Sequence, residues 1–429
     1  MSDDTAPPER SDPVRAGGGT DSPPGGDRGR LRDHPQFLRL WASQASGAVG
    51  DQMMPVALSL HILHRGGGAG DVGLVLAGRA VSLVVCLLAG GVIADRVRRT
   101  RVLIGADCFR SGLLLTTALL LPGLPLGLLP LVTALVGAGE ALSRPASRSL
   151  VPSLLPGRML ERGNALVSAA QRGSAVIGTM AGVAVVSAIG ARSALLAAGA
   201  VFALGALAVL RVPDGGPAVA SGTSVLAEAA TGLRAVRRRP WVMAVMAAVC
   251  LQLFAGTATA LTLLPVVARR EFGGDLAYGA VLATLAFGAL PAIVLAGRWR
   301  PKAPGLVSML ALSGYALLPL SLARPFPLPV VIVCFLLGGF VVELYFIYWV
   351  SALQRSFPDE VLGKVFALDQ LSAYALLPVG YALVGPAVGL AGQTATLVVG
   401  GVLVAASAPL CLAVPGVARF GNEGASAAG

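Results

Sequence analysis

Ionisable side chains lie within long apolar segments of this 429-residue chain, among them Asp51, Arg79, Glu140 and Glu343. An ionised group inside hydrocarbon costs free energy unless it faces a partner or an aqueous cavity. A carboxylate in that setting can carry a proton or dock a cation, and an arginine can hold a carboxylate or a phosphate. These residues are therefore the first candidates for chemistry.

Asp51 and Arg79 reach similar depths in two neighbouring segments. At about 1.5 Å per helical residue, Asp51 lies ~22 Å from one face and Arg79 ~10 Å from the other face of an apolar core ~30 Å thick. We expect a buried Asp51–Arg79 ion pair, which protonation could open and close.

A second group of charges lies nearer the segment ends. Glu140 precedes Arg144 by four residues, a spacing that allows an ion pair on one helix face. Asp107 and Arg110 lie one helical turn apart. We expect these residues to join the charged loop after Gly91 as gate charges, with a direct substrate contact of Glu140 as the alternative.

Glu343 lies fifteen residues into its segment, and no Arg or Lys lies within a turn of it. Tyr345, Tyr348 and Trp349 follow it, and aromatic rings suit flat organic molecules. Without a cation, Glu343 is suited to carry a proton or to dock a cationic substrate.

Two residues on other segments reach the depth of Glu343, namely Arg172 and Asp369. A structural ion pair between Glu343 and Arg172 is therefore possible. The functional and the structural interpretations of Glu343 both stay open.

The elements that position these residues follow from composition. Hydrophobic residues make up 55% of the chain and charged residues 13%, and the mean hydropathy is +0.76. A water-soluble domain cannot bury so much apolar surface, so the chain belongs in a membrane, where segments of about 20 apolar residues span as helices. Twelve such segments are predicted, at 36–62, 72–94, 102–121, 124–143, 164–186, 190–211, 241–267, 276–297, 304–323, 328–350, 365–389 and 393–415.

The segments form two copies of one unit. Gly73 and Gly91 recur as Gly279 and Gly297 at an offset of 206 residues, and Pro156, Leu160, Ala165, Leu166 and Gly178 recur as Pro358, Leu362, Ala367, Leu368 and Gly380 at an offset of 202. A duplicated helical membrane protein is typical of secondary transporters, which bind substrate between the copies.

The repeat divides the chain into five parts. We expect a disordered N-terminal tail (1–34), a first six-helix bundle (35–211), a linker (212–240), a second six-helix bundle (241–416) and a C-terminal tail (417–429). The linker includes a candidate amphipathic surface helix at 224–239.

Arginines concentrate on alternate loops, including Arg144 and Arg148 in the expected 4–5 loop. By the positive-inside rule both tails and the linker are cytoplasmic, and the chain is a multi-pass protein of the plasma membrane. The net charge of +11 then indicates orientation and attraction to anionic lipid rather than nucleic-acid binding. We expect no cofactor, no metal site and no enzyme activity, since His61 and His64 lack a third ligand and no phosphate-binding loop occurs.

The loop after the second segment reads Gly91-Val-Ile-Ala-Asp95-Arg96-Val-Arg98-Arg99-Thr100-Arg101. Gly91 allows close helix approach, Asp95 can accept hydrogen bonds from helix N-terminal amides, and the arginines can hold a carboxylate. Such a loop can latch one gate state.

This loop resembles the Gly-x-x-x-Asp-Arg-x-Gly-Arg-Arg motif of the major facilitator superfamily, with Arg98 in place of the second Gly. The stretches Phe37–Trp41, Arg144–Pro152 and Gln354–Val365 resemble its multidrug-efflux and enterobactin-exporter branch. The resemblance covers about 35–415 and implies the major facilitator fold, an all-α membrane protein of two pseudo-symmetric six-helix bundles. It implies a latch role for Asp95, Arg96, Arg99 and Arg101.

The sequence thus predicts a monomeric antiporter that exports an amphiphilic organic compound in exchange for protons, by alternating access. Two alternatives are uptake of a small polar solute by the same fold and a membrane sensor or scaffold without transport. Intact Asp51, Asp95 and Glu343 argue against the scaffold, because costly intramembrane acids serve no purpose there.

Overall fold

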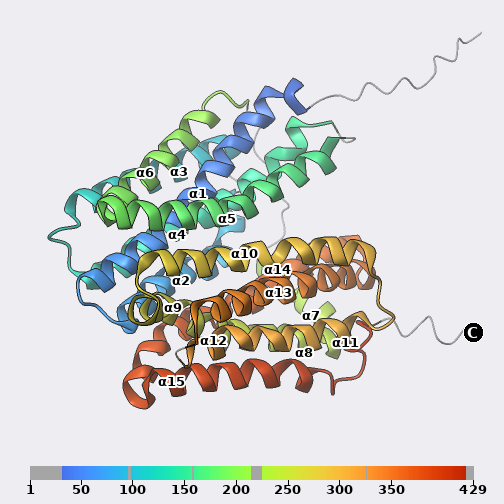
Figure 1. The fold of residues 1–429 in the computed structure, drawn as a ribbon. Coiled ribbons are helices and arrows are strands. Elements are labelled where there is room, and N and C mark those ends of the chain that lie inside the picture. The colour runs from blue at the N-terminus through green and yellow to red at the C-terminus, as the bar shows by residue number, and fades with distance from the viewer. Residues whose placement is uncertain (1–30, 95–97, 157–158, 214–224, 325, 422–429) are drawn as a thin grey trace, which may run out of the picture.

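The computed structural model describes residues 31–94, 98–156, 159–213, 225–324 and 326–421. Every regular element within these ranges is helical. The two halves lie one above the other in Figure 1, the first coloured blue to green and the second yellow to red. The tail at 1–30, and Asp95 and Arg96 of the expected latch, lie outside the described residues.

Six long helices form the first half. They are α1 (Pro35–His64), α2 (Ala69–Ala94), α3 (Arg99–Leu120), α4 (Leu129–Leu154), α5 (Leu160–Ile189) and α6 (Ala191–Val209). Short 3-10 turns, η1 (Leu31–Asp33) and η2 (Leu126–Leu128), precede α1 and α4. Within this half α1 packs against α5 and α6, and α2 packs against α4.

The second half repeats this plan with interruptions. One span consists of α8 (Pro240–Gln252), the π turn η4 (Leu253–Thr257) and α9 (Ala258–Glu271), and another of α11 (Pro304–Ser313), η5 (Gly314–Ala316) and α12 (Leu317–Leu322). The remaining spans come from α10 (Asp275–Arg298), α13 (Leu328–Ser356), α14 (Asp359–Ala375) and α15 (Leu377–Cys411). The linker helix α7 (Val225–Arg237) falls within the expected surface helix and packs against α14.

Nine stretches of the described residues have the length and hydropathy of a membrane span by themselves. The longest, Glu360–Cys411, holds two spans, because Gly392 has a φ of 83° and interrupts the helix. With α1 and α2, which are 30 and 26 residues long, the predicted fold of twelve spanning helices is confirmed.

The fourth helix departs from its predicted bounds. We expected it to end at 143, but α4 continues to Leu154, so Arg144 and Arg148 lie on a helix and not in a loop. The continuation is stabilised because Leu150 and Val151 are buried in an apolar cluster with Phe37 of α1. Its Arg144 and Arg148 line cavities inside the protein, which the hydropathy of the segment does not reveal.

The repeated glycines mark equivalent helix contacts in the two halves. A Cβ on Gly178 of α5 would lie 2.6 Å from the carbonyl oxygen of Val49, and one on Gly380 of α15 would lie 2.6 Å from that of Phe254. Both glycines therefore let two helices of one half touch backbone to backbone. This equivalence gives the sequence repeat its physical reason.

A second repeated pair joins one half to the other. A Cβ on Gly73 of α2 would meet the carbonyl oxygen of Tyr381 at 2.4 Å, and one on Gly279 of α10 would meet the Val183 side chain at 2.8 Å. His64 Nε2 also lies 2.9 Å from Asp275 Oδ2. We call this end of the molecule, which carries the 64–69 turn and the start of α10, the sealed end.

Substitution of Gly73 by Leu should force the halves apart at the sealed end, because its side chain has no room beside the Tyr381 carbonyl. Spin labels at Arg65 and Arg270 should report a distance distribution shifted to longer values by electron–electron resonance. Gly112→Ala is the control, since a Cβ there meets nothing within 4 Å. An unchanged distribution in Gly73→Leu would contradict the assigned seal.

Candidate functional site

Three neighbouring cavities, which we call lobes, lie between and within the halves and share lining residues. The polar lobe, of about 280 Å³, is enclosed by the first half and includes Asp51, Asp107 and Arg110. The tyrosine lobe, of about 590 Å³, includes Tyr315, Tyr374 and Tyr381 from the second half. The inter-half lobe, of about 640 Å³, includes Gln52, Arg172, Tyr278 and Glu343. Arg79 and Arg148 line all three and mark their junction.

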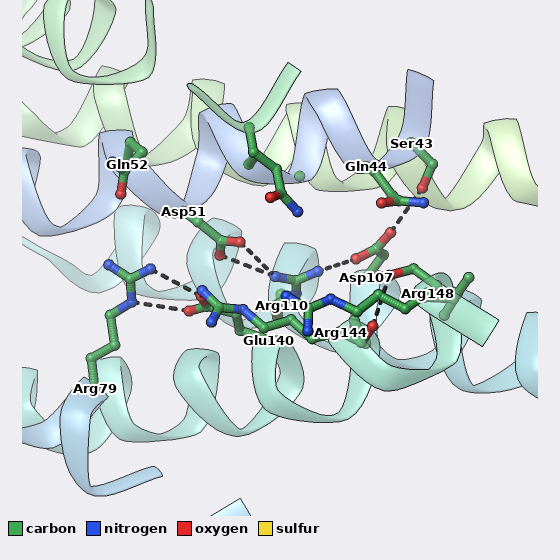
Figure 2. Close-up of a pocket in the computed structure, with 16 residues that line it drawn as sticks. Ser43, Gln44, Asp51, Gln52, Arg79, Asp107, Arg110, Glu140, Arg144 and Arg148 are labelled. Carbon is green, nitrogen blue, oxygen red and sulfur yellow. Dashed lines mark hydrogen bonds and ion pairs between the residues drawn. The ribbon is translucent and has the colours of Figure 1, made fainter. Parts of the chain in front are cut away.

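Arg110 is the centre of one charged triad in the polar lobe. Its Nη1 donates to Asp51 Oδ1 at 3.0 Å and to Oδ2 at 3.3 Å, and its Nη2 donates to Asp107 Oδ1 (Figure 2). The guanidinium also lies 4.2 Å from the centre of the Phe202 ring. Two carboxylates and one buried cation therefore share one site.

The expected Asp51–Arg79 pair is wrong. Depth alone placed these residues at one level, but the rotation of α3 turns Arg110 toward Asp51, and Arg79 points to α4 instead. Asp107 and Arg110, which lie one helical turn apart on α3, form an ion pair with each other.

Glu140 is the centre of the second triad. Its Oε2 accepts a hydrogen bond from Arg79 Nε at 3.0 Å, and its Oε1 accepts from Arg79 Nη2 at 3.1 Å and from Arg144 Nη2. The Glu140–Arg144 pair predicted from an i,i+4 spacing is thus confirmed. Only 3% of the Glu140 side chain is exposed, so both arginines hold it inside the protein.

The two triads balance each other in charge. The Asp51–Arg110–Asp107 triad has one carboxylate in excess, and the Arg79–Glu140–Arg144 triad has one cation in excess. Burial of either triad alone would leave a net charge in a low-dielectric medium, which is costly. Figure 2 shows them side by side along the polar lobe.

Glu343 has a partner from the other half. Arg172 of α5 donates from Nη1 to Glu343 Oε2 at 2.7 Å and from Nη2 to Oε1 at 2.6 Å, a bidentate ion pair. Of the two interpretations that the sequence left open, the structure therefore supports the pair. It bridges the halves across the inter-half lobe.

The aromatic residues after Glu343 do not flank it. Tyr348 donates to the Trp299 carbonyl at 2.8 Å, Trp349 Nε1 donates to Asp369 Oδ1 at 3.0 Å, and Tyr345 stacks on Trp349. These side chains are buried in the core of the second half, because successive helical residues rotate away from the face that carries Glu343. The expectation that they contact substrate beside Glu343 is corrected.

The cavity is instead lined by aromatic residues that sequence reasoning missed, chiefly Tyr278, Tyr315 and Tyr381. Each is a single tyrosine in an apolar segment, and no local pattern separates a cavity-facing ring from a core ring. Arg148 was also missed, since it was assigned to a loop.

The structure describes only some of the residues expected to form the gate latch. Gly91 lies in the last turn of α2, and Arg101 is exposed on α3. Arg99 Nη1 donates to the Ser149 carbonyl at 3.0 Å and so links α3 to α4. This hydrogen bond is one contact of the expected latch segment, whose Asp95 and Arg96 lie outside the described residues.

Comparison with known proteins gives consistent matches. A sequence model described as Major Facilitator Superfamily matches residues 40–381. Macrolide efflux protein A of Streptococcus pyogenes is 22% identical over 363 residues, covering 81% of this chain and 88% of that protein. Multidrug efflux pump Tap of Mycolicibacterium fortuitum is 25% identical over 379 residues, covering 84% and 91%.

Solved structures share the fold at low identity. The nucleoside transporter NupG aligns with a TM-score of 0.68, 12% identity and coverage of 88% of this chain and 98% of that one. A D-xylose–proton symporter aligns with a TM-score of 0.66, 13% identity and coverage of 87% and 96%.

Replacement of Arg110 by Met should lower the free energy of unfolding by about 3–5 kcal/mol, because Asp51 and Asp107 lose their shared cation inside the protein. Thermal unfolding of the protein in detergent measures this loss. Adding Asp51→Asn and Asp107→Asn to Arg110→Met should recover part of it, since no carboxylate of this triad then lacks its cation. The exposed Arg192→Met is the control, and a melting temperature of Arg110→Met equal to wild type would refute the shared-cation role.

Proposed function

Because the chain belongs to the major facilitator superfamily, we propose that it is a secondary active transporter that exports amphiphilic organic compounds in exchange for protons. The observation that carries this proposal is the cavity between the halves, lined from both sides by apolar, aromatic and charged residues. Two relatives that cover most of the chain are efflux proteins. The protein is a multi-pass membrane protein, and we place it in the plasma membrane.

The arrangement of the halves fits one state of an alternating-access cycle. The seal at Gly73, Gly279 and the His64–Asp275 pair closes one end, and the cavity extends away from it to Arg148 and Ser168. Arginines are fewer near the sealed end, so the positive-inside rule places that end outside the cell. The structure is then an inward-facing state, with both tails and the linker in the cytoplasm.

Asp51 is the proposed proton site. Its triad has one carboxylate in excess, so a proton on Asp51 neutralises the triad and leaves the Asp107–Arg110 pair intact. Asp51 lines the polar lobe with 16% of its side chain exposed, whereas Asp107 is more deeply buried. Glu140 and Glu343 are less suited, because a proton on either would leave arginine without its partner.

Each chain contains both walls of the cavity, which supports action as a monomer. We expect its cytoplasmic arginines to contact anionic lipid. Uptake of a small polar solute stays the second candidate, since a nucleoside transporter and a D-xylose–proton symporter share the fold. The direction of transport distinguishes export from uptake.

Proteoliposomes that contain the wild-type protein should accumulate an amphiphilic drug such as erythromycin or fusidate against its gradient when a pH gradient is imposed. About 100 mV of proton-motive force permits accumulation up to roughly 50-fold for one proton. Asp51→Asn should abolish accumulation but keep substrate exchange without a gradient, because Asn mimics the protonated acid. The exposed Glu271→Gln is the control, and full accumulation by Asp51→Asn would eliminate Asp51 as the proton site.

Topology is tested with single cysteines in a chain whose five native cysteines are replaced. Cysteine at Gly68, an exposed position of the sealed end, should react with an impermeant thiol reagent applied to intact cells. Cysteine at the exposed Arg238, beyond α7, should react only after the membrane is opened. The reverse labelling pattern would invert the orientation and make uptake the better proposal.

A further inference from the structure

The tyrosine lobe has an unbalanced set of charges. Arg79, Arg144 and Arg148 line it from the first half, whereas no Asp or Glu lines it among the described residues. Glu140, the one carboxylate in contact with Arg79 and Arg144, lines the polar lobe behind them. A solute in the tyrosine lobe therefore faces three guanidinium groups that share one carboxylate.

Arg148 is the cation of this lobe that has no carboxylate partner among the described residues. It makes no hydrogen bond or ion pair with any described residue, although it is exposed at the junction of the three lobes. It also follows Arg144 by four residues on α4, and like charges at that spacing destabilise a helix. A bound anion would remove this repulsion.

The opposite wall is apolar and aromatic. Leu253, Leu261 and Leu371 line it together with Tyr315 and Tyr381 of the second half. The Tyr315 hydroxyl is already bonded to Thr257 at 2.9 Å, so its ring rather than its polar group is offered to the lobe. A volume of about 590 Å³ lies in the range of sites for drug-sized molecules.

We propose that the tyrosine lobe binds an amphiphilic organic anion, with its acidic group on Arg148 and its apolar body against the tyrosine and leucine wall. The proposal rests on the export function above and specifies its substrate class as carboxylate-bearing or similarly acidic amphiphiles. Arg148 is the residue that determines this specificity. Arg144 contributes its remaining guanidinium N–H groups, because its side chain is 55% exposed and only Nη2 contacts Glu140.

Two other accounts of these arginines fit the structure less well. If an arginine serves only to orient the chain in the membrane, it is expected at the surface, where it contacts lipid headgroups. Arg148 instead lines a cavity. A cationic substrate in the tyrosine lobe would need an acid there, whereas none of the described residues that line this lobe is Asp or Glu. The acidic group itself can belong to a dissolved organic acid or to an anionic lipid.

The test compares one steroid skeleton with three head groups. Tritiated fusidate binding to the purified full chain in detergent is measured by scintillation proximity, and displacement is measured with fusidate, its neutral methyl ester and a cationic aminoethyl amide. We expect the ester and the amide to compete about tenfold or more weakly than the acid, since they lose a charge-assisted hydrogen bond. Arg148→Gln should weaken fusidate binding by about the same factor and leave ester binding unchanged.

Arg192→Gln is the matched control, because Arg192 is exposed at the start of α6 and lines none of the three lobes. Phosphatidylglycerol and phosphatidylcholine form the lipid arms. Displacement of fusidate by phosphatidylglycerol alone would identify a lipid acid as a source, and displacement by neither lipid would identify the dissolved acid. Either result supports an acid-binding lobe.

Three outcomes would overturn the proposal. The acid, the ester and the amide could compete equally, or the wild-type protein could fail to bind fusidate. Arg148→Gln could also bind fusidate as well as wild type does. The transport function fails separately. Proton-driven accumulation of erythromycin, a cation, without fusidate binding would keep the export function and reject the anion site. Fusidate binding that depends on Arg148, with no proton-driven movement of any compound, would keep the site and reject the transporter.

Discussion

Charge compensation inside a low-dielectric medium is the constraint on which this structure depends. An acid or an arginine within the membrane must find a partner of opposite charge or water, because an isolated ion there is very costly. The protein meets this constraint with two triads that balance each other and one ion pair between the halves. These triads and this pair line the lobes between and within the halves, whereas the buried Asp369 accepts a hydrogen bond from Trp349 Nε1.

Small residues make this arrangement possible. Gly178 and Gly380 bring helices of one half into backbone contact. Between the halves at the sealed end, Gly73 packs against the Tyr381 backbone and Gly279 against the Val183 side chain. Helices in a membrane gain little from burial of apolar surface, since lipid is equally apolar, and rely on close packing. Close contact at one end and a cavity extending from it give the halves a geometry suited to rocking.

The charges of the cavity also fit the proposed energetics. Arg172 and Glu343 join the two halves, so relative movement of the halves must stretch or break this pair. An organic anion that leaves the cell and a proton that enters both move positive charge inward. Each of these two movements gains about 2.3 kcal/mol from a membrane potential of 100 mV. The guanidinium groups of the tyrosine lobe favour an anionic substrate, and the membrane potential drives the exit of an anion, so the lobe agrees with export.

The sequence by itself determined the membrane environment, the twelve helices and their duplication, because apolar length and repeated spacing are local properties of the chain. It also indicated the Glu140–Arg144 pair, since helix geometry makes residues four apart neighbours. Only the tertiary structure decided that Asp51 pairs with Arg110, that Glu343 pairs with Arg172, and that Arg148 and the tyrosines face a cavity. Those contacts depend on how each helix is rotated and tilted against its neighbours, which packing across the whole bundle sets and no single segment encodes.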